Sequence, residues 1–416
     1  MQRRSLDQLS TMTLRIGISS GAFYPDLATE LAPDKAAKLG LHDLEIMLQT
    51  TGEYRPAFLA EVHRRAETAG IQIRSYHLFQ RLHPLFSSYA RRTAEGLDLI
   101  RLALDSAARH QVPILVWHGA TRDEAHGIDA WNRFLMMAGQ VGTMAAEYGV
   151  TIAIENVSWC VVSQVRDVQR LANAIPNLAP AGSLGFTFDS FQALEADANP
   201  FMLLAAMGDH LRHVHISDGA AGDTAKRHLL PGVGEIPWSA LVRAIGGKGY
   251  RGPMMLEAAV TSHEDLDRVR TFLDPFLAIA NGPVGDPDLL PKGVREGIEL
   301  FNAGEYYEAH EAIEHEWHAE RGDIRRLYQG ILQIGVGLHH VRNGNVTGAQ
   351  LLLGDGIAKV SDFLPTALGL DTSGLALAAQ ACLDEVRELG IEGIRQFDWS
   401  LVPKIMLPES LDQDPV

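Results

Sequence analysis

The feature that most constrains the fold is an alternation of short apolar runs with longer amphipathic stretches between about residues 14 and 279. The short runs are rich in β-branched and aromatic residues, and the stretches between them carry apolar residues at helical spacing. This pattern is typical of βα units and a parallel sheet. Eight runs are present, as a closed (β/α)8 barrel requires: residues 14–19, 43–48, 71–77, 113–118, 150–155, 184–189, 211–217 and 253–257.

The stretches between the runs predict the helices of such a barrel. They span residues 33–39, 55–69, 90–110, 130–148, 165–174, 200–208, 237–245 and 264–280. Four segments close with a glycine where a helix C-cap favours a left-handed residue, namely Gly40, Gly70, Gly149 and Gly249. An open doubly wound sheet is the structural alternative. The glycine-rich motif by which such sheets bind a dinucleotide (GxGxxG) is absent. The similar segment GVGEIP at residues 232–237 lacks the third glycine and follows no strand.

The chain changes character after residue 280. Residues 281–293 (NGPVGDPDLLPKG) are dense in glycine and proline and indicate a linker. Beyond them no strand pattern is visible, and helices are expected at residues 293–302, 306–320, 324–342, 346–364 and 374–389. We therefore predict an α/β protein with a (β/α)8 barrel at residues 12–282, followed by a small all-α helical bundle at residues 289–390.

Composition narrows the possible partners and location. The net charge is −16, from 36 basic and 52 acidic residues, so nucleic acid is disfavoured as a partner. Neither a long apolar run nor a signal-peptide core is present, so we expect no membrane span and a cytoplasmic location. The two cysteines, Cys160 and Cys382, match no thiolate metal motif. The sequence does not indicate the oligomeric state.

Metal-ligating residue types recur where the predicted strands end. Active groups of (β/α)8 barrels lie at the C-terminal ends of the strands. Six consecutive runs end in or carry such a residue, namely His77, His118, Glu155, Asp189, His215 and Glu257. One such residue alone is more often structural, but six at one rim would repel or desolvate one another without a cation. Carboxylate and imidazole ligands predict one divalent ion, with Mn²⁺, Mg²⁺, Co²⁺ and Zn²⁺ left open.

Two glutamates beside a metal suit proton transfer next to a carbonyl group. One carboxylate removes a proton from carbon and the other returns it, while the metal stabilises the enediolate. Glu155 and Glu257 are therefore the predicted catalytic residues. Glu45, in the second run, could point into the barrel or toward a helix, and the sequence does not decide between them. Phe23, in the loop after the first run, is predicted to offer an apolar wall to a sugar.

Five motifs carry a resemblance to a known family. They are IAIEN at 152–156, FTFDSFQ at 186–192, HVHISD at 213–218, RHLLPGVGEIPW at 227–238 and MMLE at 254–257. With them, the first part of the chain resembles the xylose isomerase-like TIM barrel superfamily, which groups sugar isomerases and epimerases with endonuclease IV. The resemblance implies metal ligation by Glu155, Asp189, His215 and Glu257, with the two glutamates as the acid/base pair.

Two departures from the family pattern help to decide between the epimerase branch and the endonuclease branch. The further metal ligands of endonuclease IV fall on His77, His118 and His228. However, Gln192 stands where both branches usually have a histidine, and Lys226 stands where the endonuclease branch has an aspartate.

We therefore predict a metal-dependent isomerase or epimerase of a sugar or sugar phosphate. The substrate-binding candidates are His77, His118, Gln192, His228 and Phe23. An endonuclease IV-like AP endonuclease and a non-catalytic barrel that binds metal and a polyol are the alternatives.

The C-terminal part resembles a small helical family of unknown function, of the DUF309 type. The motifs are FNAGEYYEAHEAIEHEW at 301–317 and LYQGILQIGVGLHHVRNGN at 327–345. Candidate residues here share two helix faces: one with His310, Glu314 and Trp317, the other with Gln329, Gln333 and His340. They form either a buried polar network or a ligand pocket, and the resemblance implies no activity.

Overall fold

The computed structural model describes residues 13–79, 84–124, 129–223, 225–281, 290–320 and 324–407. They divide into two compact units, with the division at Asn281 and Gly282. The predicted domain limits at residues 12, 282 and 289 lie outside the described residues and stay predictions. Each unit is described by itself.

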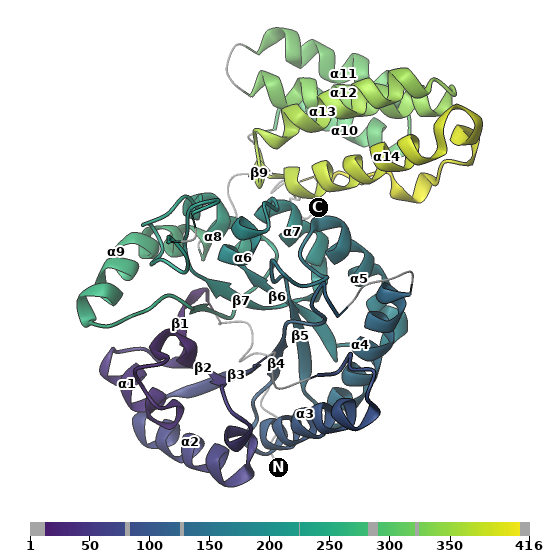
Figure 1. Cartoon of the computed structure of the whole chain (residues 1–416). Coiled ribbons are helices and arrows are strands. Elements are labelled where there is room, and N and C mark those ends of the chain that lie inside the picture. Colours follow the sequence, from purple (N-terminus) through teal and green to yellow (C-terminus); the bar gives the residue numbers. More distant parts are fainter. Residues whose placement is uncertain are drawn as a thin grey trace, which may run out of the picture. The chain divides into compact units, whose positions relative to one another are not determined.

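The first unit is a closed barrel of eight parallel strands in chain order, in which β8 pairs with β1 (Figure 1). The strands are β1 (Arg15–Ser19), β2 (Asp43–Leu48), β3 (Gln72–Leu78), β4 (Ile114–Trp117), β5 (Thr151–Glu155), β6 (Leu184–Asp189), β7 (Leu211–Ile216) and β8 (Pro253–Leu256). Each strand end lies within one residue of the predicted run. The (β/α)8 prediction is therefore confirmed, and the open sheet is excluded.

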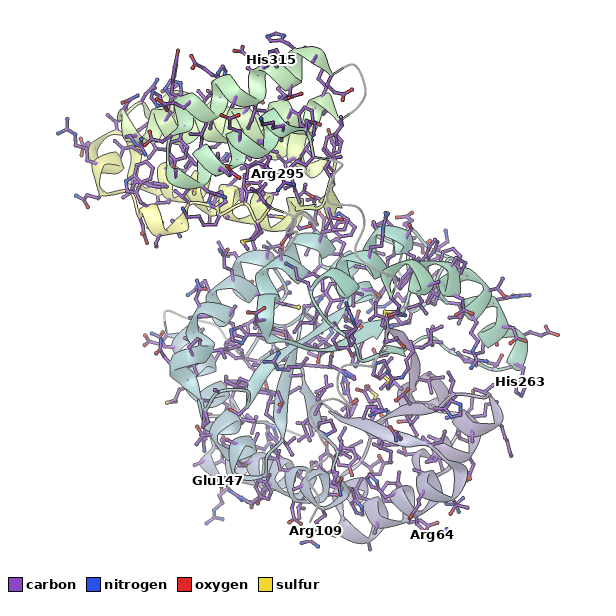
Figure 2. The ribbon with its side chains drawn as sticks, turned by 180° about the vertical axis from the view of Figure 1, so that it is seen from behind. Arg64, Arg109, Glu147, His263, Arg295 and His315 are labelled. Carbon is purple, nitrogen blue, oxygen red and sulfur yellow. The ribbon has the colours of Figure 1, made fainter. Side chains whose placement is uncertain are left out.

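Helices surround the strands on the outside of the barrel (Figure 1). They are α1 (Ala32–Lys38), α2 (Pro56–Ala69), α3 (Ala90–His110), α4 (Ala130–Glu147), α5 (Val165–Leu178), α6 (Ser190–Glu195), α7 (Pro200–Met207), α8 (Trp238–Gly247) and α9 (His263–Ala280). All four predicted capping glycines have the left-handed φ that a C-cap favours. Exposed charges such as Arg64, Arg109 and Glu147 point away from the barrel (Figure 2). The apolar faces of the helices pack on the strands.

Two helices of the barrel differ from the prediction by more than two residues. The helix α6 was not expected, and it begins where the Asp189 side chain caps it by accepting a hydrogen bond of 2.6 Å from the Gln192 backbone N–H. The helix α5 continues to Leu178 through Pro176, where the prediction ended at residue 174. Because Pro176 lies in the last turn, its missing N–H removes only one hydrogen bond of this helix.

One side chain joins the two ends of the barrel. The Asn281 Oδ1 accepts a hydrogen bond of 2.8 Å from the Leu14 backbone N–H. The Asn281 Nδ2 in turn donates a bond of 2.9 Å to the Leu14 carbonyl. The residue that follows α9 therefore holds the residue that precedes β1.

The second unit is mainly helical. Its helices are α10 (Lys292–Ala303), α11 (Tyr306–Ala319), α12 (Arg325–Arg342), α13 (Val346–Ser361) and α14 (Thr372–Gly393). A short antiparallel pair, β9 (Thr366–Ala367) and β10 (Leu370–Asp371), was not predicted, because two residues per strand are too few to show an alternation. Glycines let α12 and α13 approach closely, and a Cβ on Gly330 would lie 3.1 Å from the Gly356 carbonyl oxygen. No helix in the described part of the chain is long and apolar enough to span a membrane.

Candidate active site

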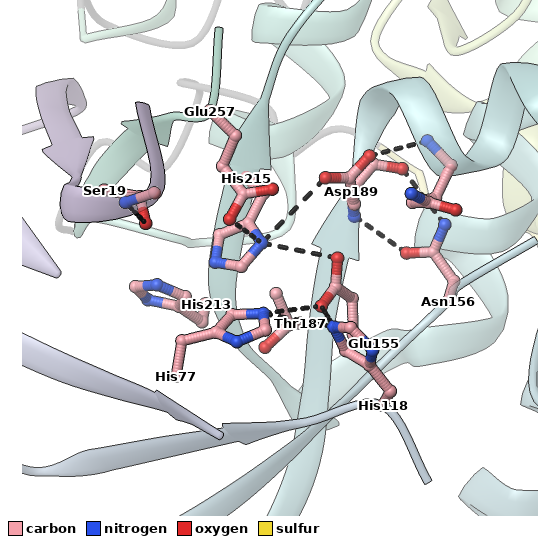
Figure 3. Close-up of polar contacts among 12 residues, drawn as sticks. Ser19, His77, His118, Glu155, Asn156, Thr187, Asp189, His213, His215 and Glu257 are labelled. Atoms are coloured by element: carbon pink, nitrogen blue, oxygen red, sulfur yellow. Dashed lines mark hydrogen bonds and ion pairs between the residues drawn. The ribbon is translucent and has the colours of Figure 1, made fainter. Parts of the chain in front are cut away.

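Six strands bring the predicted ligands to one end of the barrel. His77 lies in β3 and His215 in β7, Glu155 and Asp189 end β5 and β6, and His118 and Glu257 directly follow β4 and β8. Figure 3 shows these side chains pointing toward one another. Four of them are at most 3% exposed, whereas the His118 and Glu257 side chains are each 14% exposed. Solvent therefore reaches the cluster beside His118 and Glu257.

Four residues form an oxygen-rich ligand set. Ligand atoms of Glu155, Asp189, His215 and Glu257 all lie within 4.8 Å of one another. The His215 Nδ1 is 3.4 Å from Glu155 Oε1, 3.4 Å from Glu257 Oε1 and 3.9 Å from Asp189 Oδ2. The Asp189 Oδ2 is buried and has no hydrogen-bond partner among the described residues. Three carboxylates, one imidazole and an unsatisfied buried oxygen fit a hard or borderline divalent cation.

A second group of donor atoms shares Glu155 with the first. The Nε2 atoms of His77 and His118 lie 3.2 Å apart, and each is 3.2 Å from Glu155 Oε2. Such a triangle matches one face of a tetrahedral site with bonds of about 2.0–2.2 Å. The two oxygens of Glu155 thus face different groups, Oε1 toward His215 and Oε2 toward the two histidines. These residues could hold a second ion or bind substrate hydroxyl groups.

The electrostatics of the cluster favour a bound positive charge. Burial raises the pKa of Asp189 well above its usual range, and the carboxylates of Glu155 and Glu257 raise it further. Burial likewise raises the pKa of Glu257 to about 7. Burial acts to lower the pKa of His215, but the carboxylates of Glu257, Glu45 and Glu155 outweigh it and raise the pKa well above its usual range. Without a cation, these groups retain protons to limit their repulsion.

The strand ends next to the cluster are joined by side-chain amides. The Asn156 Oδ1 accepts a bond of 2.7 Å from the Asp189 N–H, and its Nδ2 donates one of 3.0 Å to the Asp189 carbonyl. The Gln192 Oε1 accepts a bond of 2.9 Å from the Ser158 N–H. Gln192, predicted to contact substrate, therefore holds the loop after β5 through its amide oxygen. Its substrate contact stays a prediction.

The loop after β7 is held by one buried carboxylate. Asp218 accepts four hydrogen bonds of 2.8–3.1 Å, from the backbone N–H groups of Gly219, Gly232 and Ile236 and from the Trp238 Nε1–H. These bonds tie both ends of the loop to the end of β7. They fix the path of the segment between them, which carries His228.

Two other predicted substrate residues come from loops at the same end. His228 has a positive φ of 47°, its Nδ1 lies 3.0 Å from the Ser217 Oγ, and its ring lies 4.4 Å from the Phe191 ring. Phe23 ends the short 3₁₀ helix η2 (Ser20–Phe23) and is 6% exposed. Neither belongs to the ligand groups found among the described residues. Their roles toward a substrate stay predictions.

Two residues of the cluster were not among the predicted ligands: His213, and Glu45, whose direction the sequence left open. The Glu45 carboxylate points into the barrel, where its Oε2 lies 2.9 Å from the His213 Nε2 and 3.2 Å from the His215 Nε2. Burial acts to raise the pKa of Glu45, but His215 and His213 hold it well below its usual range. Strand alternation offers a signal, because His213 and His215 share one face of β7 and Glu45 alternates with buried apolar residues of β2.

The candidate residues of the second unit form a looser arrangement. On α11, the His310 Nδ1 is 3.9 Å from the Glu314 Oε2. Arg325 stacks on the Trp317 ring at 4.6 Å, and the His340 Nδ1 lies 3.2 Å from the Asn345 Nδ2. Two of these candidates each have a buried atom without a hydrogen-bond partner within the described ranges, namely Trp317 Nε1 and Gln333 Oε1. Gln329 is half-buried on α12. Among the described residues, the polar contact that joins two of the six candidates is the one between His310 and Glu314.

Comparison with known proteins places the barrel in a family. The model of the xylose isomerase-like TIM barrel family matches residues 33–275, more than half of the chain. The chain belongs to this family. A second family model, a domain of unknown function (DUF309), matches residues 294–352.

Relatives of this xylose isomerase-like chain include epimerases. An uncharacterized protein of Mycobacterium leprae (strain TN), ML2432, is 26% identical over 286 residues, covering 64% of this chain and 96% of the relative. Fructoselysine 3-epimerase of Escherichia coli O157:H7 is 28% identical over 269 residues, covering 61% and 94% respectively. The crystal structure of a D-tagatose 3-epimerase-like protein aligns with a TM-score of 0.54 and 21% identity over 65% of this chain and 98% of that one. At that identity the structural match shows the fold alone.

Proposed function

We propose that the barrel is a divalent-metal-dependent isomerase or epimerase that moves a proton at the carbon next to a sugar carbonyl. The observation that carries the proposal is that two glutamates, the buried Glu155 and the partly exposed Glu257, flank one imidazole nitrogen within a four-residue ligand set. The relative named fructoselysine 3-epimerase supports a ketose or ketose phosphate as the proposed substrate class.

The two glutamates carry the proton transfers. A cation held by Glu155, Asp189, His215 and Glu257 would supply Lewis-acid polarisation of the substrate carbonyl. One glutamate removes the proton from the adjacent carbon, and the C–H electron pair moves into the enediolate. The other glutamate protonates the opposite face as the electron pair returns, so the stereocentre inverts without net oxidation or reduction.

The surroundings of the two glutamates differ. Both oxygens of Glu155 lie near imidazole nitrogens, from His215 on one side and from His77 and His118 on the other. Glu257 has a more exposed side chain and contacts the His215 Nδ1. We propose that Glu257 exchanges its proton with solvent more readily. His118, with the same 14% exposure, is the leading candidate for a substrate hydroxyl contact.

The test replaces each glutamate by its amide. Ketoses and ketose phosphates, including D-tagatose, D-psicose and fructoselysine, are incubated with the metal-loaded protein in deuterium oxide. Inversion and deuterium uptake next to the carbonyl are followed by NMR. Glu155→Gln and Glu257→Gln should each lower the rate of inversion by about 10²–10⁴-fold, because each removes one proton-transfer group while keeping the side-chain shape.

Glu147→Gln is the matched control, since Glu147 is an exposed glutamate at the end of α4 that points away from the barrel (Figure 2). Its rate should equal that of the unchanged protein. Inversion at the control rate in both active-site variants would refute the two-glutamate mechanism.

A second candidate function rests on the His77, His118 and Glu155 triangle. An endonuclease IV-like site would use this group for a second ion, but a second ion of that type would lose a ligand at Gln192, and Lys226 has the wrong charge for a ligand. Elemental analysis and cleavage of DNA containing an abasic site separate the two functions. One ion per chain without cleavage supports the epimerase, and two ions with cleavage support the nuclease. A chain that binds no ion would refute both.

A further inference from the structure

Glu45 is a fully buried carboxylate that contacts the candidate site across the barrel interior. Its side chain is 0% exposed, and its Oε2 lies 3.2 Å from the His215 Nε2. The same oxygen lies 2.9 Å from the His213 Nε2 and accepts a bond of 2.7 Å from the Ser75 Oγ. Because β2 and β7 are not neighbours in the barrel, the contacts of Glu45 with His213 and His215 cross its interior rather than follow the sheet. Glu45 thus links β2 and β3 to the histidines of β7.

The two nitrogens of the His215 ring face different surroundings. Nδ1 faces the carboxylates of Glu155, Asp189 and Glu257, and Nε2 faces Glu45. An imidazole that ligates a metal through one nitrogen carries its hydrogen on the other, and a carboxylate at that second nitrogen fixes both the tautomer and the ring orientation. The Oε2 of Glu45 occupies this second position.

We propose that Glu45 is a positioning residue, whose carboxylate keeps the hydrogen of His215 on Nε2 and thereby presents Nδ1 as a metal ligand. This inference rests on the proposed function only in taking His215 as a ligand. A carboxylate with no solvent exposure needs donors, and Ser75, His213 and His215 supply three of them to one oxygen. Ser75 and His213 therefore hold the acceptor in place, and His215 is the group that it orients.

The first test measures Co²⁺ binding by the full-length chain. Glu45→Gln keeps the side-chain shape but replaces the charged acceptor, so the dissociation constant for Co²⁺ should rise by about 10–100-fold. The visible absorption of the bound ion should also change, because the histidine ligand is no longer held in one orientation. Glu147→Gln is the matched control: it makes the same exchange at an exposed glutamate at the end of α4. Its dissociation constant should stay within about threefold of the unchanged chain.

The second test does not depend on the folding of a variant. NMR of the unchanged full-length chain with ¹⁵N-labelled histidine, loaded with Zn²⁺, reports which ring nitrogen of His215 carries hydrogen. A hydrogen on Nε2 and none on Nδ1 supports the proposal. A bare Nε2, or a folded Glu45→Gln chain that binds Co²⁺ as tightly as the Glu147→Gln control, overturns it.

Failure of the proposed function gives a different result. If the unchanged chain binds neither Co²⁺ nor Zn²⁺, the metal site is refuted. The metal-free spectrum then decides the role of Glu45: a slowly exchanging Nε2 hydrogen on His215 supports positioning, and a hydrogen on Nδ1 alone overturns it.

Discussion

Replacing Asp218 by asparagine should destabilise the barrel strongly, although the change is isosteric. The two oxygens of Asp218 each accept two hydrogen bonds, Oδ1 from Gly219 and Ile236 and Oδ2 from Gly232 and Trp238. Asparagine keeps one acceptor oxygen, so in either orientation its NH₂ group faces two N–H donors. Each unsatisfied buried donor costs about 1–3 kcal/mol, and we expect a loss of about 3 kcal/mol in the free energy of unfolding.

Calorimetry of the full-length chain measures this effect. For a barrel of this size, about 3 kcal/mol lowers the thermal midpoint by about 6–12 °C. Asp223→Asn is the control, because Asp223 lies in the same loop with its side chain 41% exposed. The control should change stability by no more than about 0.5 kcal/mol. Equal midpoints for the two variants would show that the four hydrogen bonds do not hold the loop.

Two further predictions concern the histidines and the ligand set. Burial and the neighbouring His110 lower the pKa of His63 from 6.5 to about 4, so the unfolded chain takes up this proton first as the pH falls. The contribution of neutral His63 to the free energy of unfolding is fully present above about pH 6.5. It decreases by about 2 kcal/mol as the pH falls to about 4.5. Calorimetry should show that His63→Asn removes this pH dependence, and an unchanged slope would contradict the assignment. Asp189→Ala and His215→Ala should each lower the metal content measured by elemental analysis, and full content in both variants would place the ion elsewhere.

The barrel could be predicted because its strands are short, mainly apolar runs separated by longer amphipathic helices. Each predicted run is a buried segment whose neighbours in the sheet are also neighbours in the chain, so local pattern and topology agree. The helix α6 was missed because it depends on the Asp189 cap, whose effect is not visible in the residue pattern of so short a segment. The ladder of β9 and β10 is too short for any periodicity.

The candidate site could be predicted only where a residue stands at a strand end. The carboxyl ends of barrel strands meet at one rim. The positions of Glu155, Asp189 and Glu257 at predicted strand ends were therefore sufficient to predict that these three side chains lie together. Glu45 lies in the middle of β2, where its direction depends on which residues of the strand face inward. Its contact with His215 depends on the distance across a closed barrel, which no local pattern contains.

The two hydrogen bonds between Leu14 and Asn281 hold the first and last residues of the barrel segment next to each other. A cyclic arrangement of strands has no intrinsic first member, so a chain joined across this point and opened in another loop would keep every strand pairing. Such circular permutants should fold to the same barrel. By the same geometry, a module fused before Leu14 or after Asn281 would leave the barrel from the same place. Exchanging the order of the two units in the gene would therefore not require the barrel to be redesigned.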